Sequence, residues 1–458
     1  MFSDFGKHLQ AGLTITIATI IWLSAAPDKA APEVSAISYL PATVVVEMWE
    51  LQPNGNRGEQ RCINYSGARS GNWGCTAYCS QGGGYPCTNP DIHPPPVPKP
   101  AGQSAWVYPF SSNQVTVAID GSAAYDGYTY NRYLRDVVPQ ETHPEAFAAK
   151  AVTAQAIAAR TYAYHRGGAG VIDNSAGYQV YVPFRYDSMK RNYGDFRPVV
   201  DAAVQRQIYL SPDSNANRDP IDAQYFDDRP VSTLSGAGGN LVGVPDPVSQ
   251  SSCGSYASGN GVGFSQKGAS RWALGNPQYN PNNPPCAPSS VTWRNPLQIL
   301  VHYYTDVDVW DRAGYAQAPD KRWNALQISN PPPAIVQSGS THTLDVYVQN
   351  TGVDAWDTSY ALSYWLCLPN SNCDNVNGTR RVQLASPLLP GQARWLHSLP
   401  VYFPAHWRGP ATISLDMRTS SAWFGTGGWY SQDIPICIDS CTKTYLPIQR
   451  RGYIPQNQ

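Results

Sequence analysis

The sequence predicts a multidomain protein with a small cysteine-rich module, a middle domain of helices and strands, and an all-β sandwich. Its 458 residues exceed the size of one ordinary domain. The proline-rich run DIHPPPVPKPAG lies within residues 91–104 and indicates a linker. From residue 322 onward, short alternating runs separated by turn residues are spaced as in a β-sandwich. We therefore expect domains at residues 34–90, 105–312 and 322–442, followed by a tail at 443–458 that is too short to fold alone.

Residues 1–31 are predicted to direct export, either as a signal peptide or as an N-terminal anchor. An uncharged run over residues 11–26 follows Lys7 and His8. This run is shorter than the roughly 20 residues that span a bilayer and is close to the core of a signal peptide. Pro27 and Pro32 disturb the candidate cleavage sites, so both forms stay open. Either form predicts a secreted or cell-envelope protein.

The ten cysteines fall in local groups, as expected of disulfide bonds in an exported chain. The expected pairs in the later groups are Cys253–Cys286, Cys367–Cys373 and Cys437–Cys441. Two more bridges of open connectivity are expected in the first group, which consists of Cys62, Cys75, Cys79 and Cys87. A four-thiolate zinc site is the alternative there, although the spacing lacks the C-x2-C pairs of common zinc ribbons. A strand-like run at residues 43–49 opens the module that carries this first group.

The middle domain is predicted to contain a long alanine-rich helix. Residues 114–119 (QVTVAI) alternate like a half-buried strand and open the domain. Nine alanines then fall between Ala146 and Ala163, with no glycine or proline after Pro144. Thr142 and Glu145 fit a capping box at the start of this helix, and an extended segment is expected before it. A stripe of small side chains predicts that the helix is buried on much of its circumference, and residues 199–210 predict a second helix leading into a strand.

Several motifs resemble the sporulation stage II protein D / amidase-enhancer family (SpoIID/LytB). YLRDVVPQE at residues 133–141 and KAVTAQAIAARTYAY at 150–164 are similar to the family pattern YL-x-GVVP-x-EM followed by EALKAQAVAARTYA. Further matches follow in family order: GYQVY at 177–181, LVGVPDP at 241–247, GNGVGFSQKGA at 259–269 and LQILVHYYTDVDV at 297–309. The resemblance implies a mixed α+β catalytic domain. Members of the family characterised as enzymes are lytic transglycosylases that cut peptidoglycan, and others enhance a partner amidase.

Glu141 aligns with the glutamate that the family uses first as an acid and then as a base. We expect it at the N-terminus of the alanine helix, which would lower its pKa, so the family role requires an apolar pocket that raises it. The alternative is that Glu141 only caps the helix or pairs with Arg160. The chain also departs from the pattern, because Thr142 replaces a methionine and the interval from Glu141 to Arg160 is one residue longer. Thr142 would occupy the catalytic position in an ungapped alignment, Glu145 is a fallback carboxylate, and a binding-only member stays open.

Six other residues match family motifs and are expected to bind substrate along a groove. They are Gln155, Arg160, Gln179, Tyr181, Ser265 and Gln266. The planar guanidinium of Arg160 suits a clamp on the lactyl carboxylate of muramic acid, and its alternative role is a structural ion pair.

No metal and no cofactor are expected. Some family members hold zinc with cysteine and histidine around the QVY motif, but residues 165–181 contain His165 and no cysteine, and Asn260 replaces the histidine of the family's GHGVG. His302 is predicted to be a core residue, and His143 is a candidate proton shuttle beside the site. Turn geometry, rather than nucleotide binding, explains glycines 259, 261 and 263.

The C-terminal runs VYVQNTGVDAW, LLPGQARW, FPAHWRGPATISLDM and WFGTGGWYSQDI resemble an Ig-like domain of the four-tryptophan type. The resemblance implies that these tryptophans fill or edge the sandwich, and that the domain is a binding or positioning accessory. The four are Trp356, Trp395, Trp407 and Trp423.

The composition and the motifs together predict a carbohydrate-active protein of the cell wall. The net charge is −1 and charged residues make up 14% of the chain, which argues against a nucleic-acid partner. The 14 tryptophans and 29 tyrosines suit sugar contact, although secreted β-domains are also rich in aromatic residues. The predicted function is that of a peptidoglycan lytic transglycosylase that cleaves MurNAc–GlcNAc strands and leaves 1,6-anhydro-MurNAc ends. The alternatives are a non-enzymatic peptidoglycan-binding enhancer of a cell-wall amidase and a surface adhesion protein.

Overall fold

The computed structural model describes residues 40–47, 49–51, 57–60, 114–121, 132–168, 170–181, 186, 195–282, 286, 291–369, 373 and 380–441. All of them fall within one compact unit, Ile37–Gln458. The predicted export segment, the linker, the first cysteine group and the tail lie outside the described residues. Within the described part, no helix is long and apolar enough to cross a membrane.

A three-stranded sheet forms part of the middle domain. Strand β1 (Thr43–Glu47) lies at its centre and pairs antiparallel with β4 (Gln114–Ala118) and parallel with β5 (Val171–Asp173). The early strand was therefore predicted correctly, but its assignment to a separate N-terminal module is wrong. The inward-facing Val44 and Val46 are fully buried in the same core as the helices of the middle domain. Strands β2 (Trp49–Leu51) and β3 (Arg57–Gln60) form a hairpin beyond β1.

Helix α3 (Ala149–Gly167) is the central element of the middle domain. It packs against α2 (Tyr133–Thr142), α5 (Arg197–Gln205), α6 (Gln266–Leu274) and α7 (Pro296–Tyr303), as well as strand β6 (Ile208–Pro212). Every residue from Ala154 to Tyr164 is buried, so the expectation of a helix enclosed on most sides is confirmed. Alanine side chains allow this close approach because they leave little volume between the helix backbones. Helix α5 leads into strand β6, as expected at residues 199–210, and β6 pairs with β11 (Val307–Asp311).

Two predictions at the start of this helix are wrong. Residues 133–142 form a helix rather than an extended segment, with Pro139 inside it, because Tyr133, Leu134, Val137 and Val138 present one buried face at helical spacing. The capping box does not form either. The Thr142 hydroxyl donates to the Val138 carbonyl at the end of α2, and α3 begins only after the turn at residues 144–147, with Ala148 as its N-cap.

Short strands and turns complete the middle domain. Strand β7 (Tyr225–Phe226) pairs with β10 (Phe264–Ser265), and β8 (Val231–Ser232) pairs with β9 (Pro245–Asp246). A short 3-10 helix, η1 (Ser251–Cys253), lies between β9 and β10. The described residues of this domain are thus mixed α and β, as expected.

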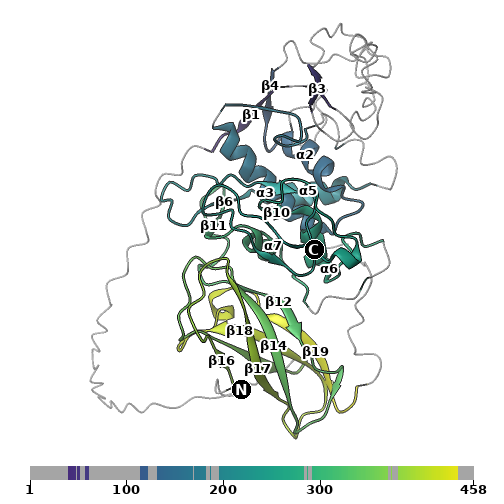
Figure 1. Ribbon diagram of the computed structural model, residues 1–458, viewed down its shortest axis with the longest axis vertical. Helices are drawn as coiled ribbons and strands as arrows, with labels where there is room; N and C mark the ends of the chain where they lie inside the picture. Colours follow the sequence, from purple (N-terminus) through teal and green to yellow (C-terminus); the bar gives the residue numbers. More distant parts are fainter. Residues whose placement is uncertain are drawn as a thin grey trace, which may run out of the picture. The chain divides into compact units, whose positions relative to one another are not determined.

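The C-terminal part consists of two β-sheets, whose strands are mostly antiparallel, and the sheets form two layers (Figure 1). One sheet has the order β12–β14–β17, and its strands are Trp323–Ser329, Thr341–Asn350 and Ala393–Tyr402. The other has the order β13–β19–β18–β15–β16, and its strands are Ile335–Val336, Gln432–Ile438, Gly409–Arg418, Ala361–Cys367 and Val382–Gln383, with the short helix η2 (Gly425–Gly427) between β18 and β19. The alternating runs expected from residue 322 onward are observed as strands, among them β14, β15, β17 and β18. Of the four tryptophans, Trp356 is buried against Tyr360, whereas Trp395, Trp407 and Trp423 are partly exposed.

The middle domain and the sandwich share one continuous hydrophobic core. The indole N–H of Trp293 donates to the Ala325 carbonyl across the junction at 3.0 Å. His302 is fully buried and its Nδ1 lies 2.6 Å from Oε1 of Gln349. Burial lowers the pKa of His302 to about 4, so the side chain is neutral at pH 7. The prediction of a core histidine is confirmed.

Disulfide bonds join Cys253 to Cys286, Cys367 to Cys373 and Cys437 to Cys441, as the local grouping predicts. Disulfides of this kind indicate an extracellular or secreted protein.

Candidate active site

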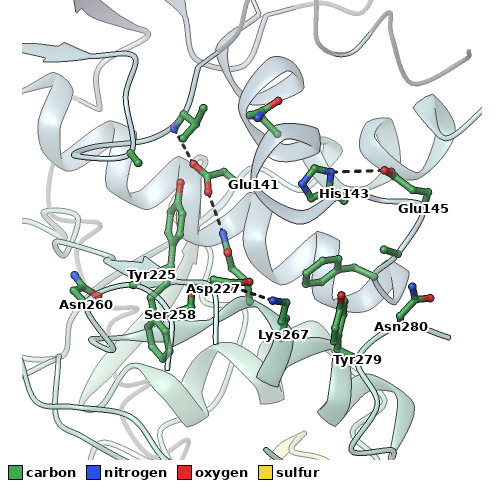
Figure 2. A pocket seen from close by; sticks show the side chains of 18 of the residues that line it. Glu141, His143, Glu145, Tyr225, Asp227, Ser258, Asn260, Lys267, Tyr279 and Asn280 are labelled. Carbon is green, nitrogen blue, oxygen red and sulfur yellow. Dashed lines mark hydrogen bonds and ion pairs between the residues drawn. The ribbon is translucent and has the colours of Figure 1, made fainter. Parts of the chain in front are cut away.

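Glu141 lies in the last turn of α2, which ends when His143 adopts a left-handed conformation (φ 44°). It is half-buried, and both carboxylate oxygens accept hydrogen bonds from uncharged groups. The Val180 backbone N–H donates to Oε1 at 2.7 Å, and the Gln266 side-chain amide donates to Oε2 at 3.1 Å. Figure 2 shows these two bonds reaching Glu141 from different segments. Glu141 therefore neither caps α3 nor pairs with Arg160.

Burial raises the pKa of Glu141 above its usual value, although the Val180 N–H, the Gln266 amide and the Tyr225 hydroxyl oppose the rise. The expected conflict with a helix N-terminus does not arise, because Glu141 is at the C-terminal end of α2. The helix dipole is negative there and disfavours the carboxylate further. The site is thus suited to hold a proton on Glu141.

A cleft of about 1200 Å³ opens beside Glu141. Aromatic and amide side chains dominate its walls, and these are groups that stack on sugar rings and bond to hydroxyl and acetamido groups. They include Phe147, Tyr178, Phe196, Tyr225, Tyr279, Gln140, Asn260, Gln266, Asn280 and Asn282.

The other carboxylates of the cleft each lie beside a basic side chain. Asp227 lies 2.8 Å from Nζ of Lys267, and Glu145 lies 3.6 Å from Nδ1 of His143 (Figure 2). Burial raises the pKa of Glu141, so this carboxyl group is suited to retain a proton. Thr142 is buried and does not line the cleft, so the ungapped alternative does not place a functional group there.

Of the six expected substrate-binding residues, Gln266 lines the cleft. Ser265 is buried and serves as the N-cap of α6, where its hydroxyl accepts from the Gly268 N–H at 3.1 Å. Gln155 is buried in α3, and its amide makes no hydrogen bond to another described residue.

The QVY motif contributes its backbone rather than its conspicuous side chains. Gln179 is buried and accepts from the Tyr133 hydroxyl, while the ring of Tyr181 stacks on that of Tyr133 at 5.2 Å. These contacts hold the segment so that Val180, between the two, directs its N–H at Glu141 and lines the cleft.

Arg160 is fully buried and makes the ion pair that was its alternative role. Its Nε lies 2.9 Å from Oδ1 of Asp120, and its terminal nitrogens donate to the carbonyls of Val204 and Arg206 at 2.6 Å each. The guanidinium thus caps the C-terminal end of α5 and does not reach the cleft.

We expect Arg160→Met to destabilise the fold without changing glycan affinity. The variant loses charged hydrogen bonds in a buried setting, so the free energy of unfolding should fall by about 2 kcal/mol. Denaturant unfolding and binding of glycan strands measure the two effects separately. Weaker binding with unchanged stability would instead support the role of Arg160 as a clamp on the substrate.

Sequence patterns did not identify Tyr225, Asp227, Lys267 or Tyr279 as lining residues. Lys267 directly follows Gln266 in the family motif, and this adjacency could have identified it. Tyr225 reaches the site through a strand pairing between residues far apart in sequence. The glycines of the GNGVG loop have φ between 73° and 87°, and a side chain at Gly263 would collide with the Gln224 carbonyl, so turn geometry explains them. Among the described residues, no group of three or more His, Cys, Asp or Glu could hold a metal ion.

These features define a mixed α+β domain whose cleft holds a carboxylate suited to retain a proton. The family model of the stage II sporulation protein (SpoIID) matches residues 121–219, so the chain carries a SpoIID domain. The SpoIID family acts on cell-wall peptidoglycan.

No curated protein sequence matches the chain. Among solved structures, AvmM, titled as catalysing macrocyclization in alchivemycin A biosynthesis, is 13% identical over 28% of this chain and 94% of its own, with a TM-score of 0.19. The CARDB domain of PF1109 from Pyrococcus furiosus is 10% identical over 28% and 97%, with a TM-score of 0.17. An AA10 lytic polysaccharide monooxygenase from Streptomyces lividans is 14% identical over 28% and 63%, with a TM-score of 0.13. Likenesses this weak support no argument about the chain.

Proposed function

We propose that this protein is an exported peptidoglycan lytic transglycosylase with Glu141 as its acid and base. The observation that carries the proposal is a half-buried glutamate with a raised pKa, bonded to neutral donors, at the wall of a cleft of about 1200 Å³. The aromatic and amide walls of the cleft suit a glycan strand.

One carboxyl group suffices for this reaction. Protonated Glu141 donates its proton to O4, the glycosidic oxygen between MurNAc C1 and GlcNAc C4, and the C1–O4 bond breaks. The resulting carboxylate then takes the proton of the MurNAc 6-hydroxyl as O6 bonds to C1. The product is a 1,6-anhydro ring, Glu141 regains its proton, and no water is consumed. A hydrolase would instead need a second carboxylate, either to activate a water molecule or to act as the nucleophile itself.

Product analysis tests the proposal. Purified protein is incubated with glycan strands stripped of peptides and, separately, with intact peptidoglycan, and mass spectrometry identifies the new ends. We expect 1,6-anhydro-MurNAc ends. Reducing ends would indicate hydrolysis.

Binding without any product would favour the alternative, a non-enzymatic enhancer of a cell-wall amidase. The substitution of methionine by Thr142 and the extra residue before Arg160 favour that alternative. Adding such an amidase to the same assay, and measuring peptide release, separates the two functions.

The pH dependence of cleavage should follow the protonation of Glu141. The acid must carry a proton to donate it, so the rate is full below the pKa of Glu141 and falls as pH rises through it. Because burial raises this pKa, the fall should occur at higher pH than for an exposed glutamate. A rate profile between pH 4 and 9 measures this, and a rate that increases throughout that range would contradict the assignment.

A further inference from the structure

Tyr225 approaches Glu141 alongside Gln266. Strands β7 and β10 pair in parallel, with Tyr225 opposite Phe264 and Phe226 opposite Ser265. Helix α6 begins at the next residue, Gln266, so one short ladder brings both side chains to the site. Figure 2 shows the Tyr225 side chain extending toward Glu141 with its hydroxyl beside the carboxylate.

The Tyr225 hydroxyl is buried, and although it makes no hydrogen bond of good geometry to a described residue, its interaction with the Glu141 carboxylate lowers the pKa of Glu141. A buried hydroxyl whose hydrogen bonding is incomplete costs free energy, so its presence at a cleft wall calls for an explanation. The ring is held from the side by Tyr162, whose centroid lies 6.5 Å away in an edge-on arrangement. Packing of the ring thus helps to keep the hydroxyl beside Glu141.

The present partners of Glu141 suit one protonation state better than the other. The Val180 N–H can only donate, and the Gln266 amide donates through its nitrogen, so both favour the carboxylate. A hydroxyl can donate to a carboxylate and accept from a carboxylic acid. An acid that becomes a base within one turnover needs a partner of this second kind.

We propose that Tyr225 is a positioning residue whose hydroxyl bonds to Glu141 in both states, accepting from the acid and donating to the carboxylate. The inference rests on the acid–base role proposed above. The hydroxyl stabilises the carboxylate that is left after the glycosidic bond breaks. It also keeps this carboxylate in position to accept the proton of the 6-hydroxyl. Over one turnover, Tyr225 undergoes no net gain or loss of a proton.

Other titratable groups surround the pair and define the controls. Tyr133 of α2 and His143 at the end of α2 face Glu141, and Tyr162 of α3 faces Tyr225. Asp227, Lys267 and Glu145 complete the charges that line the cleft. Burial and the charge of Glu141 raise the pKa of Tyr225, so the phenol keeps its proton as a donor.

The test is the pKa of Glu141 in Tyr225→Phe, which keeps the ring and removes the hydroxyl. Carbon NMR of carboxyl-labelled glutamate reports it directly, with the signal assigned by its loss in Glu141→Gln. We expect the pKa to rise by about one pH unit, as loss of one charge-assisted hydrogen bond requires. Cleavage should slow by about tenfold, and its alkaline limb should move upward by the same amount.

Tyr162→Phe is the matched control. Its ring packs beside Tyr225 and lies 5.2 Å from the Arg166 guanidinium, so removing this hydroxyl should leave the pKa of Glu141 unchanged. Should Tyr225→Phe fail to fold, 3-fluorotyrosine at position 225 is a stronger donor and should lower the pKa instead. An unchanged Glu141 pKa in both Tyr225 variants overturns the inference. Because the titration needs no turnover, absence of 1,6-anhydro product would count against the proposed function alone.

Discussion

Glu141→Gln should reduce formation of 1,6-anhydro ends by about 1000-fold, within the range that general acid–base catalysis contributes. Glutamine has nearly the same shape, and its carbonyl can still accept from the Val180 N–H. It cannot donate a proton to the glycosidic oxygen or take one from the 6-hydroxyl. Affinity for glycan strands should persist, so the loss belongs to the chemical step. Single-turnover mass spectrometry of released ends measures it.

Glu145→Gln is the control for this variant. Glu145 also lines the cleft, but it faces His143 at 3.6 Å. Its removal should leave the rate close to that of the unmodified protein. The assignment of the acid would pass to Glu145 if this variant lost activity and Glu141→Gln kept it.

Arg271→Met should lower the free energy of unfolding by about 3–5 kcal/mol, because it leaves a buried carboxylate without its cation. Arg271 on α6 forms a bidentate pair with Asp228, at 2.6 and 3.0 Å, and both side chains are at most 1% exposed. Asp228 also accepts from the Ser255 hydroxyl, and its backbone pairs with Ser258, a cleft residue. The variant should therefore loosen this wall of the cleft as well as destabilise the fold. Denaturant unfolding gives the free energy, and hydrogen exchange at residues 255–260 reports the wall.

Arg294→Met provides the comparison. Arg294 pairs with Asp433 at 3.0 Å, but its side chain is 69% exposed, and solvent screens such pairs. Its loss should cost less than about 1 kcal/mol. Similar losses in both variants would show that the Arg271–Asp228 pair contributes no more than a surface ion pair. Adding Asp228→Asn to Arg271→Met should recover part of the stability, because the unpaired charge is then removed.

Local patterns were sufficient for much of the fold. Alanine content predicted α3, two-residue alternation predicted the sandwich strands, and close spacing in an exported chain predicted the three disulfides. Each of these signals depends on neighbours within a few residues. The order of family motifs likewise pointed to Glu141, which lines the cleft.

The sequence by itself thus determined the SpoIID domain, the central helix and the glutamate on which the proposed chemistry depends. Only the tertiary structure decided that residues 133–142 are helical, that Arg160 faces inward to Asp120, and that Tyr225 stands beside Gln266. These outcomes depend on burial against segments tens of residues away, and the free energy of that burial outweighs the local preferences of Pro139 or of two adjacent valines. A motif can therefore serve to direct a backbone N–H, as at Val180, while its larger side chains pack in the core.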